Sequence, residues 1–565
     1  MIPLLEIKNL QVDFRTEQGI STAVEDISFQ VKRGELLAIV GESGSGKSVT
    51  AMSILQLLSE KSAIYRNGEI LFSPDGQQST NLLRASSQQI RQIRGHRIAM
   101  IFQEPMTSLN PVFTCGNQVA ESLREHKKLN SSEAKKATIK LFEQVKLPHP
   151  SDIFNRYPHQ LSGGQKQRVM IALAMSCEPD LLICDEPTTA LDVTVQKTIL
   201  TLIRELQLSN NMGVIFITHD LGVVAEIADR AVVMYKGKIV EQASIEDLFT
   251  QPAHAYTRAL IACRPVLYPK GTRLPVVSDF LNDSKTIEKK PLQDLPASTD
   301  LLIEAKALSV WYPREKSFLG KVTQYTKAVD EVNLEVYKGE TLGLVGESGC
   351  GKTTLGRCLL RLLEPTKGQI LYNDKDLTKM SRNELRSLRK EIQIVFQDPY
   401  SSLNPSLTIE QALTEPLAVH GMIKTAKGRR DRVVELLEKV DLSSTHLKRY
   451  PHEFSGGQRQ RIVIARAITV NPSFVVCDES VSALDVSVQA QVLNMLSDLK
   501  RDLGFTILFI SHDLSVVHFI SDRIAVMQQG KIVEIGEAGK VFKNPSSDYT
   551  RQLIASIPGI RHQSR

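Results

Sequence analysis

Gly41-Glu42-Ser43-Gly44-Ser45-Gly46-Lys47-Ser48 follows an apolar run, residues 36–40, and precedes residues 48–58, which are expected to form a helix. The apolar run is typical of a parallel strand buried on both faces. Glycines let backbone N–H groups approach phosphates, which also bind at a helix N-terminus. We therefore expect Lys47 to reach the β- and γ-phosphates of a nucleotide and the Ser48 hydroxyl to hold Mg²⁺.

The same pattern returns in the second half of the chain. It reads Gly346-Glu347-Ser348-Gly349-Cys350-Gly351-Lys352-Thr353. From average composition, one such match arises by accident in roughly one chain in fifty of this size. Two matches, each between a strand and a helix, exclude chance, and we expect Lys352 and Thr353 to act as their counterparts do. A long internal repeat predicts two copies of one fold.

Further motifs repeat in the same order. They are Phe102-Gln103-Glu104-Pro105 with Phe396-Gln397-Asp398-Pro399, Ser162-Gly163-Gly164-Gln165 with Ser455-Gly456-Gly457-Gln458, Cys184-Asp185-Glu186 with Cys477-Asp478-Glu479, and Thr218-His219-Asp220 with Ser511-His512-Asp513. The offset, which is the difference in residue number between matching positions of the two halves, is 305 at the lysines and 294 at the glutamines. It is 293 from the Ser-Gly-Gly triplets onward. The first half therefore holds 11 extra residues, which we expect as a surface loop in the polar stretch 72–87.

Apolar periodicity lapses between the two copies, over residues 264–300, where Pro, Lys, Asp and Ser dominate. This composition predicts a linker. The domains are then residues 1–263 and 301–565. A chain of 565 residues, 42% hydrophobic and 23% charged, has the length for two large globular cores.

Composition excludes several other classes of protein. A formal charge of +6 spread over this length does not predict a nucleic-acid binder. No apolar run approaches the roughly 18 residues of a spanning helix, and the start does not resemble a signal peptide. The 7 cysteines form no CxxC pair, and Cys184 and Cys477 lie in strand-like runs where reduced core cysteines are common. We expect a cytosolic protein.

Two apolar, strand-like runs each end in a pair of carboxylates, Asp185-Glu186 and Asp478-Glu479. Ionised carboxylates are seldom buried without a partner, and ligands of open α/β sheets sit at the carboxyl ends of strands. We assign the two aspartates to Mg²⁺, through water. The two glutamates are the candidate bases that polarise an attacking water.

The remaining repeated residues suit phosphate recognition. Ser162 and Ser455 with their glycines precede helix-like segments, where a hydroxyl, free N–H groups and the positive dipole end suit an anion. The triplet also occurs in ordinary flexible loops, but here it stands just upstream of the acidic strand. His219 and His512 each follow an apolar strand, 34 residues after the strand aspartate, which suggests a γ-phosphate sensor.

Two aromatic residues hold matching places near the start of each half, Phe14 and Tyr312. Either side chain suits stacking on adenine, although aromatic residues also pack without a ligand. Trp311 is the competing choice in the second half.

Together these residues resemble the ATP-binding cassette (ABC) family. The glycine loops match Walker A, the glutamines the Q-loop, Ser-Gly-Gly-Gln the signature, Asp-Glu Walker B, residues 190–192 and 483–485 the D-loop, and the histidines the switch His. The resemblance covers both halves outside the linker. It implies ATP hydrolysis with Mg²⁺, to which Gln103 and Gln397 contribute as metal contacts and catalytic residues. It also implies two α/β P-loop NTPase domains, each with a mixed-sheet core, a small antiparallel β subdomain and a helical signature subdomain.

A finer resemblance concerns importers. Residues 103–111 and 397–405 look like the Q-loops of the oligopeptide/dipeptide/nickel importer ATPases, as do Tyr-Pro-His at 157–159 and 450–452 and Tyr-Thr at 256–257 and 549–550. The resemblance implies the motor of a bacterial importer for a dipeptide, oligopeptide, glutathione or nickel. The motor would lie at the cytoplasmic face of the inner membrane and drive two separate permeases and, through them, a solute-binding protein.

The family resemblance also implies that the two halves pair head-to-tail around two ATPs. Lys47, Asp185 and Glu186 then share a site with Ser455. Lys352, Asp478 and Glu479 share the other site with Ser162. Gln103 and Gln397 are expected to pass the motion to the permeases.

One departure and two alternative functions remain. Ser480 replaces the Pro that follows the Walker B Glu, as Pro187 does in the first half, and we expect little effect. A soluble tandem-cassette factor acting on ribosomes or DNA usually carries long charged helices, coiled coils or zinc modules, and no such segment is evident here. An exporter motor is disfavoured because the Q-loop sequences resemble those of importers.

Overall fold

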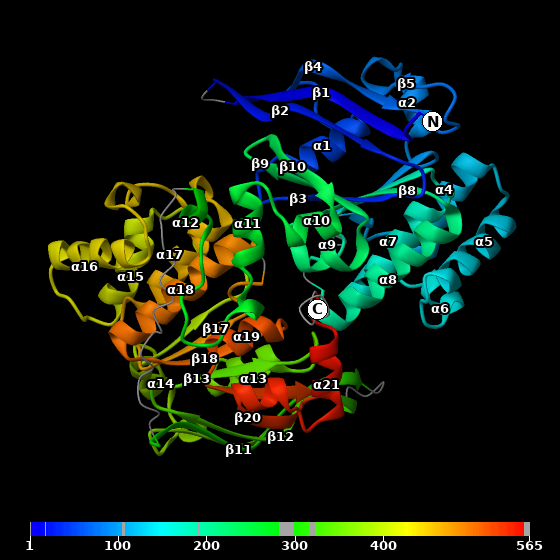
Figure 1. Cartoon of the computed structure of the whole chain (residues 1–565). Coiled ribbons are helices and arrows are strands. Elements are labelled where there is room, and N and C mark those ends of the chain that lie inside the picture. The colour runs from blue at the N-terminus through cyan, green and yellow to red at the C-terminus, as the bar shows by residue number, and fades with distance from the viewer. Residues whose placement is uncertain are drawn as a thin grey trace.

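The computed structural model describes residues 2–16, 19–103, 108–189, 191–281, 299–316, 322–482 and 484–558. Two copies of one α/β unit lie one above the other in Figure 1, the first half at the top and the second below. Several predicted features lie outside the described residues: residues 282–298 of the linker, residues 104–107 of the first Q-loop, Ala190 and Ala483.

The first half contains two sheets. An antiparallel sheet has the order β2-β1-β4-β5, with β1 Leu5–Thr16, β2 Gly19–Val31, β4 Ala63–Phe72 and β5 Thr80–Asn81. A mixed sheet has the order β10-β9-β3-β8-β7-β6, with β3 Leu36–Val40, β6 Ile98–Ile101, β7 Leu181–Asp185, β8 Gly213–Thr218, β9 Arg230–Tyr235 and β10 Lys238–Ser244. Only the β9–β10 pair of the mixed sheet is antiparallel.

Helices cover the mixed sheet and build a separate helical subdomain. They are α1 Lys47–Ile54, α2 Ser87–Ile93, α4 Cys115–Lys127, α5 Ser131–Gln144, α6 Pro150–Phe154, α7 Gly163–Met175, α8 Val193–Asn210, α9 Leu221–Ile227, α10 Ile245–Thr250 and α11 Ala255–Ala262. The short helix α12 Val277–Leu281 follows them in the chain but lies among the helices of the second half. Buried side chains of α4, α5, α6 and α7 share one core cluster, which forms the subdomain headed by the Ser-Gly-Gly triplet.

The second half repeats this arrangement. Its antiparallel sheet is β12-β11-β14-β15, and its mixed sheet is β16-β17-β18-β13-β19-β20. The strands are β11 Leu301–Lys316, β12 Val322–Tyr337, β13 Thr341–Val345, β14 Lys367–Tyr372, β15 Lys375–Asp376, β16 Ile392–Val395, β17 Phe474–Asp478, β18 Thr506–Ser511, β19 Arg523–Gln528 and β20 Lys531–Glu537. The helices are α13 Lys352–Leu359, α14 Arg382–Leu388, α15 Ile409–Val419, α16 Ala426–Lys439, α17 Gly456–Ile468, α18 Val486–Leu503, α19 Leu514–Ile520, α20 Ala538–Lys543 and α21 Asp548–Ala555.

The predicted buried strands are confirmed. Every residue of β3, β7 and β17 is buried, because helices and the antiparallel sheet cover both faces of the parallel core. Cys184 and Cys477 lie in β7 and β17 as buried free thiols. The helix expected over residues 48–58 is shorter than predicted, since α1 ends at Ile54 and Gln56 takes a positive φ of 48°.

The 11 extra residues of the first half do not lie in a single loop, so that prediction is only partly correct. The offset between the halves drops from 305 at the lysines to 300 where Ile70 and Ile370 occupy the same register. It reaches 295 at the matching helix caps Ser86 and Ser381. Five residues therefore lie between α1 and the end of β4, and only five more lie in the predicted stretch 72–87.

Residues 264–281, within the predicted linker, pack on the second half. The Leu274 N–H donates to Asn494 Oδ1 over 2.9 Å, and Asn494 Nδ2 donates back to the Leu274 carbonyl over 2.8 Å. Arg273 pairs with Asp498 of α18 at 2.8 Å. Leu274 and Val277 join a core cluster that continues into α18. Figure 1 shows α12 among the helices of the second half.

The C-terminal end of the second half contacts the first half in turn. Lys197 Nζ of α8 donates to the carbonyl of Ala555 over 2.8 Å, and Arg264 Nη2 donates to that of Pro558 over 3.0 Å. We call residues 264–281 and 555–558, which each reach onto the opposite half, the clasp. The C-terminal part of each half is thus bound to the other half.

Asn494→Ala is expected to loosen the clasp. The change removes two buried hydrogen bonds to Leu274 and leaves its N–H and carbonyl without partners, at a cost of about 1–3 kcal/mol. Limited proteolysis should cut residues 264–281 faster, and the thermal midpoint should fall. Asn155→Ala, which removes one exposed hydrogen bond to Ser151, is the control. Cleavage at the same rate in both variants would contradict the role given to Asn494.

Candidate functional site

The glycine loop of each half lies between a strand and a helix, as predicted. Gly46 has a φ of +100°, and a Cβ there would lie 2.7 Å from the Ala23 carbonyl oxygen. Only glycine avoids both the strain and the clash. In the second half Gly351 has a φ of +110°, and a Cβ would meet the Ala328 carbonyl. The loop is therefore packed tightly on the antiparallel sheet before its helix begins.

The loop lysines are buried and point back into their own loops. Lys47 Nζ donates to the carbonyls of Gly41 and Glu42 over 2.7 and 2.8 Å. Lys352 Nζ donates to Gly346 and Glu347 over 2.7 and 3.0 Å. Burial lowers the pKa of Lys47 from its ordinary value, against the opposing effect of nearby carboxylates, Glu186 first among them.

The residues predicted to hold Mg²⁺ meet in both halves. Ser48 Oγ lies 3.1 Å from Asp185 Oδ1, and Thr353 Oγ1 lies 2.8 Å from Asp478 Oδ1. Burial raises the pKa of Asp185 to about 6, since a buried carboxylate lacks the water that would stabilise its charge. A buried carboxylate beside a hydroxyl is a hard oxygen donor set, which fits Mg²⁺.

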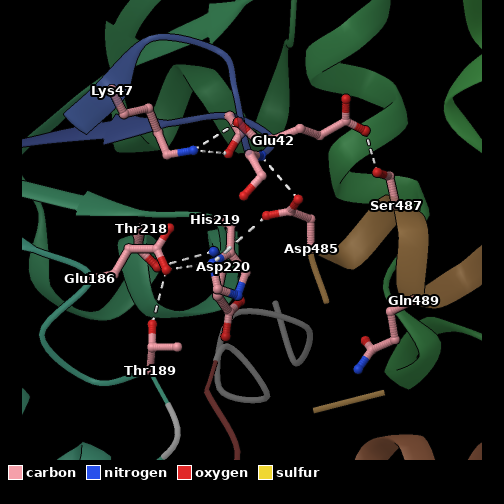
Figure 2. A network of polar contacts seen from close by, with 12 residues as sticks. Glu42, Lys47, Glu186, Thr189, Thr218, His219, Asp220, Asp485, Ser487 and Gln489 are labelled. Atoms are coloured by element: carbon pink, nitrogen blue, oxygen red, sulfur yellow. Dashed lines mark hydrogen bonds and ion pairs between the residues drawn. The ribbon is translucent and has the colours of Figure 1, made fainter. Parts of the chain in front are cut away.

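Glu186 is the centre of a polar network in the first half. Its Oε2 lies 3.1 Å from Gln103 Nε2, 3.0 Å from Thr189 Oγ1 and 3.3 Å from His219 Nδ1. Figure 2 shows His219 and Thr189 converging on this carboxylate. Burial opposes its charge, but the hydrogen bond and charge of His219, with the charge of Lys47, outweigh burial and lower the pKa of Glu186 to about 2.

The second half reproduces this network with small differences. Glu479 Oε2 lies 2.8 Å from Gln397 Nε2 and 3.5 Å from His512 Nδ1. Both glutamates take a φ of +47°, a left-handed conformation that side chains rarely adopt, and backbone hydrogen bonds from their N–H groups to Ile217 and Ile510 hold them there. Such strained residues cluster at functional sites. Ser480 leaves this geometry intact.

Hydrogen bonds join each phosphate loop to the opposite half. The Ser43 N–H donates to Asp485 Oδ2 over 2.9 Å, and the Ser348 N–H donates to Asp192 Oδ1 over 2.5 Å. Asp485 also lies 4.0 Å from His219, and Ser487 Oγ hydrogen-bonds the Glu42 carboxylate. Figure 2 shows Asp485 and Ser487 reaching toward the first loop and His219. The halves thus meet head-to-tail at the D-loop aspartates.

The signature serines cap their helices. Ser162 and Ser455 each accept the N–H of the Gln three residues on, Gln165 and Gln458, in a capping box. A Cβ on Gly164 would lie 2.7 Å from Val195, and one on Gly457 would lie 2.4 Å from Val488, so close helix packing requires these glycines. Within the described ranges, no hydrogen bond links either serine to the opposite phosphate loop. Their shared sites remain a prediction.

The predicted adenine contacts occupy equivalent places. Phe14 pairs with Ser21 and Tyr312 with Thr326 on neighbouring strands. Phe14 is half-buried against the core, whereas Tyr312 is 42% exposed. Trp311 lies under Lys327 and Lys367, whose Nζ atoms are 5.1 and 4.8 Å from its ring centroid. Adenine stacking by any of these side chains stays a prediction.

Sequence reasoning gave no role to two tyrosines that touch the loops. The Glu42 N–H donates to the Tyr256 hydroxyl, and the Glu347 N–H donates to that of Tyr549, both over 3.0 Å. The offset between the two tyrosines is 293, the same as that of the signature and switch residues. That shared offset was the signal available in the sequence.

Comparisons with known proteins identify the family of the chain. A family model described as ABC transporter matches residues 24–189 and 329–482, and one described as oligopeptide/dipeptide transporter, C-terminal region, matches residues 240–287 and 533–565. Among solved structures, a dimeric ATP-binding cassette bound to ADP and Pi is 26% identical, with a TM-score of 0.38, over 42% of this chain and 99% of that one.

The curated relatives match nearly the whole chain. The glutathione import ATP-binding protein GsiA of Escherichia coli K12 is 49% identical over 562 residues, 98% of this chain and 89% of that protein. GsiA of Pectobacterium atrosepticum is 47% identical over 560 residues, again 98% and 89%. The chain therefore belongs to the ABC transporter family, as an ATPase with two ATP-binding cassettes on one polypeptide.

Proposed function

We propose that this chain is the ATP-hydrolysing motor of a bacterial importer for glutathione or related peptides, working through separate membrane permeases. The observation that carries the proposal is the pair of matching polar networks around Glu186 and Glu479, together with similarity to a glutathione import ATPase over 98% of this chain and 89% of that protein. No helix in the described part of the chain is long and apolar enough to cross a membrane. The spanning path therefore belongs, in this proposal, to two permease subunits, with a solute-binding protein outside.

The loop residues bind and orient the nucleotide. Backbone N–H groups and Lys47 hold the phosphates, and the Ser48 hydroxyl and Asp185 carboxylate hold the metal. Mg²⁺ bound there supplies charge neutralisation at the phosphates. The same roles fall to Lys352, Thr353 and Asp478 in the second half, which repeats the contacts.

Glu186 and Glu479 orient the attacking water. A carboxylate whose pKa is lowered to about 2, as in Glu186, stays ionised at neutral pH and accepts a hydrogen bond from water. Its weak basicity suits polarisation of the water more than complete removal of its proton. Gln103 and His219, which touch Glu186, hold that carboxylate in place and place a hydrogen-bond donor beside the terminal phosphate.

Transport follows from coupling between the halves. Asp192 and Asp485 bond the opposite phosphate loops, so a change in the distance between the halves reaches both sites. Gln103 and Gln397, whose side chains touch the catalytic glutamates, would pass that change to permeases docked beside the helical subdomains. The chain would then lie at the cytoplasmic face of the inner membrane as a peripheral protein.

Glu186→Gln and Glu479→Gln should each lower steady-state ATP turnover substantially. A positioned general base typically contributes about 10²–10⁴-fold at its own site. The matched control is Glu178→Gln, the same change at an exposed carboxylate paired with Lys127. If one glutamate variant hydrolyses ATP and supports transport like the parent, that half has no working site of the kind described.

The shared-site arrangement is tested by Ser455→Arg. Head-to-tail pairing predicts that this change damages the site of Lys47 and leaves ATP binding at Lys352 largely intact. Combining it with Lys47→Ala should add little, because both changes disable one site, whereas combining it with Lys352→Ala should abolish both. Nucleotide stoichiometry and turnover are the measurements. Coupling of Ser455 to Lys352 in place of Lys47 would refute the shared sites.

Transport itself is tested in two steps. The chain is purified from membranes with its co-purifying permeases and reconstituted in vesicles with ATP inside the compartment that the chain faces. ATP-dependent uptake of glutathione is expected, with dipeptides and Ni²⁺ as the competing solutes. A double Glu186→Gln, Glu479→Gln variant should abolish uptake. Co-sedimentation with ribosomes and not with membranes would overturn the importer proposal.

A further inference from the structure

The first peptide group of each phosphate loop is hydrogen-bonded through both its N–H and its carbonyl. In the first half, the N–H of Glu42 donates to Tyr256 Oη over 3.0 Å, while the carbonyl of Gly41 accepts from Lys47 Nζ over 2.7 Å. These two groups belong to the same peptide bond. Because that bond is planar, a partner that fixes the N–H also fixes the direction of the carbonyl.

The second loop repeats this arrangement with the same donor–acceptor distances. The N–H of Glu347 donates to Tyr549 Oη over 3.0 Å, and the carbonyl of Gly346 accepts from Lys352 Nζ over 2.7 Å. Two loops far apart in the chain thus share a hydrogen bond to a tyrosine that lies outside the motifs of the nucleotide site. A chance hydrogen bond would not be expected to recur with its geometry preserved.

The loop needs such an external restraint. Gly41 and Gly346 have φ values of +153° and +157°, and a Cβ at either would lie within 2.2 Å of the carbonyl oxygen of Met234 or Met527. Glycine is therefore required at both positions. It is also the residue that restricts the backbone least, so the orientation of the peptide must be set by its partners.

Tyr256 is itself held rigidly. Its ring is fully buried and packs against Tyr235, with ring centroids 4.3 Å apart. The start of α11 is fixed by Glu241, which accepts the N–H groups of Ala253 and His254 over 2.8 and 3.0 Å. The hydroxyl is therefore presented to the loop at a fixed position.

Tyr549 is held in the corresponding way. Glu534 accepts the N–H groups of Ser546 and Ser547, just before α21. Burial raises the pKa of both tyrosines above the ordinary value, so each phenol stays un-ionised. A neutral phenol oxygen accepts the loop N–H without adding negative charge beside a site for phosphates.

We propose that Tyr256 and Tyr549 are positioning residues for ATP: each fixes the first peptide of its phosphate loop, and the carbonyl of that peptide holds the loop lysine within the loop that binds the phosphates. The inference rests on the loops binding ATP. The two tyrosines also link the site to the clasp. The helix α11, which begins with Ala255 and contains Tyr256, is followed by residues 264–281, and α21, which contains Tyr549, ends at Ala555, where the other part of the clasp begins.

Tyr256→Phe tests the proposal in the full chain with the second site silenced by Lys352→Ala. The ring and its packing remain, and only the hydroxyl is lost. Loss of one hydrogen bond is expected to weaken trinitrophenyl-ATP binding, followed by fluorescence, about fivefold. Tyr549→Phe in a Lys47→Ala chain should behave in the same way.

Tyr372→Phe is the matched control. Tyr372 is also buried, and its hydroxyl donates to Glu391 over 3.0 Å, on the antiparallel sheet away from both loop contacts. It should leave nucleotide affinity unchanged. Thermal midpoints of the three Tyr→Phe variants are compared to show that any change in affinity does not follow from a change in stability.

A second comparison separates positioning of the lysine from a general effect on the loop. If Tyr256 acts through Lys47, then in the Lys352→Ala chain Tyr256→Phe should weaken binding of trinitrophenyl-ATP but not of trinitrophenyl-AMP, which lacks the β- and γ-phosphates that Lys47 reaches. An equal loss of affinity for both nucleotides, or no loss for trinitrophenyl-ATP, overturns the proposal. Either result leaves ATP binding by the parent chain untouched, so the proposed function is judged separately.

Discussion

Each phosphate loop is held partly by a carboxylate from the other half. Asp485 accepts the Ser43 N–H, and Asp192 accepts the N–H of Ser348. Successive N–H groups in such loops form concavities that attract anions. An aspartate in this place therefore satisfies a donor and also adds negative charge near the phosphates. Its charge reaches Lys47, whose pKa Asp485 raises against the effect of burial.

The two sites are built alike but are not identical. Thr189 donates to the Glu186 carboxylate, whereas the corresponding Ser482 hydroxyl donates to the main-chain carbonyl of Glu479. Burial raises the pKa of Asp478, and the charge of Arg357, 3.9 Å away, opposes this rise only in part. Both glutamates keep their contacts with a glutamine and a histidine, so these differences change the electrostatics around each glutamate and not the set of residues that meet there.

The sequence predicted the parallel core and the pairing of site residues well, for a physical reason. Strands such as β3 and β17 are buried on both faces, so they need uninterrupted apolar residues, and polar groups directly after them must share one edge of the sheet. The contact of Ser48 with Asp185 follows from that topology. Local patterns of this kind therefore predict both the burial of a strand and the place of the polar residues that follow it.

Other features depend on contacts that no local pattern encodes. Residues 264–281 have the composition of a linker, yet Leu274 is buried because Asn494, 220 residues later, satisfies its backbone. The extra residues of the first half were placed by composition in one loop, but the antiparallel register divides them. Tyr256 looked like part of a C-terminal pattern, and only the fold brings its hydroxyl to Glu42.

The clasp has a consequence for how the protein is made. A transporter with two separate ATPase chains must match their amounts, and any surplus chain exposes the surface meant for its partner. Here Arg264 and Lys197 of one half bind Pro558 and Ala555 of the other within a single polypeptide. Translation therefore produces the two halves in a fixed one-to-one stoichiometry. A mutation in either half is then present in every molecule of the protein.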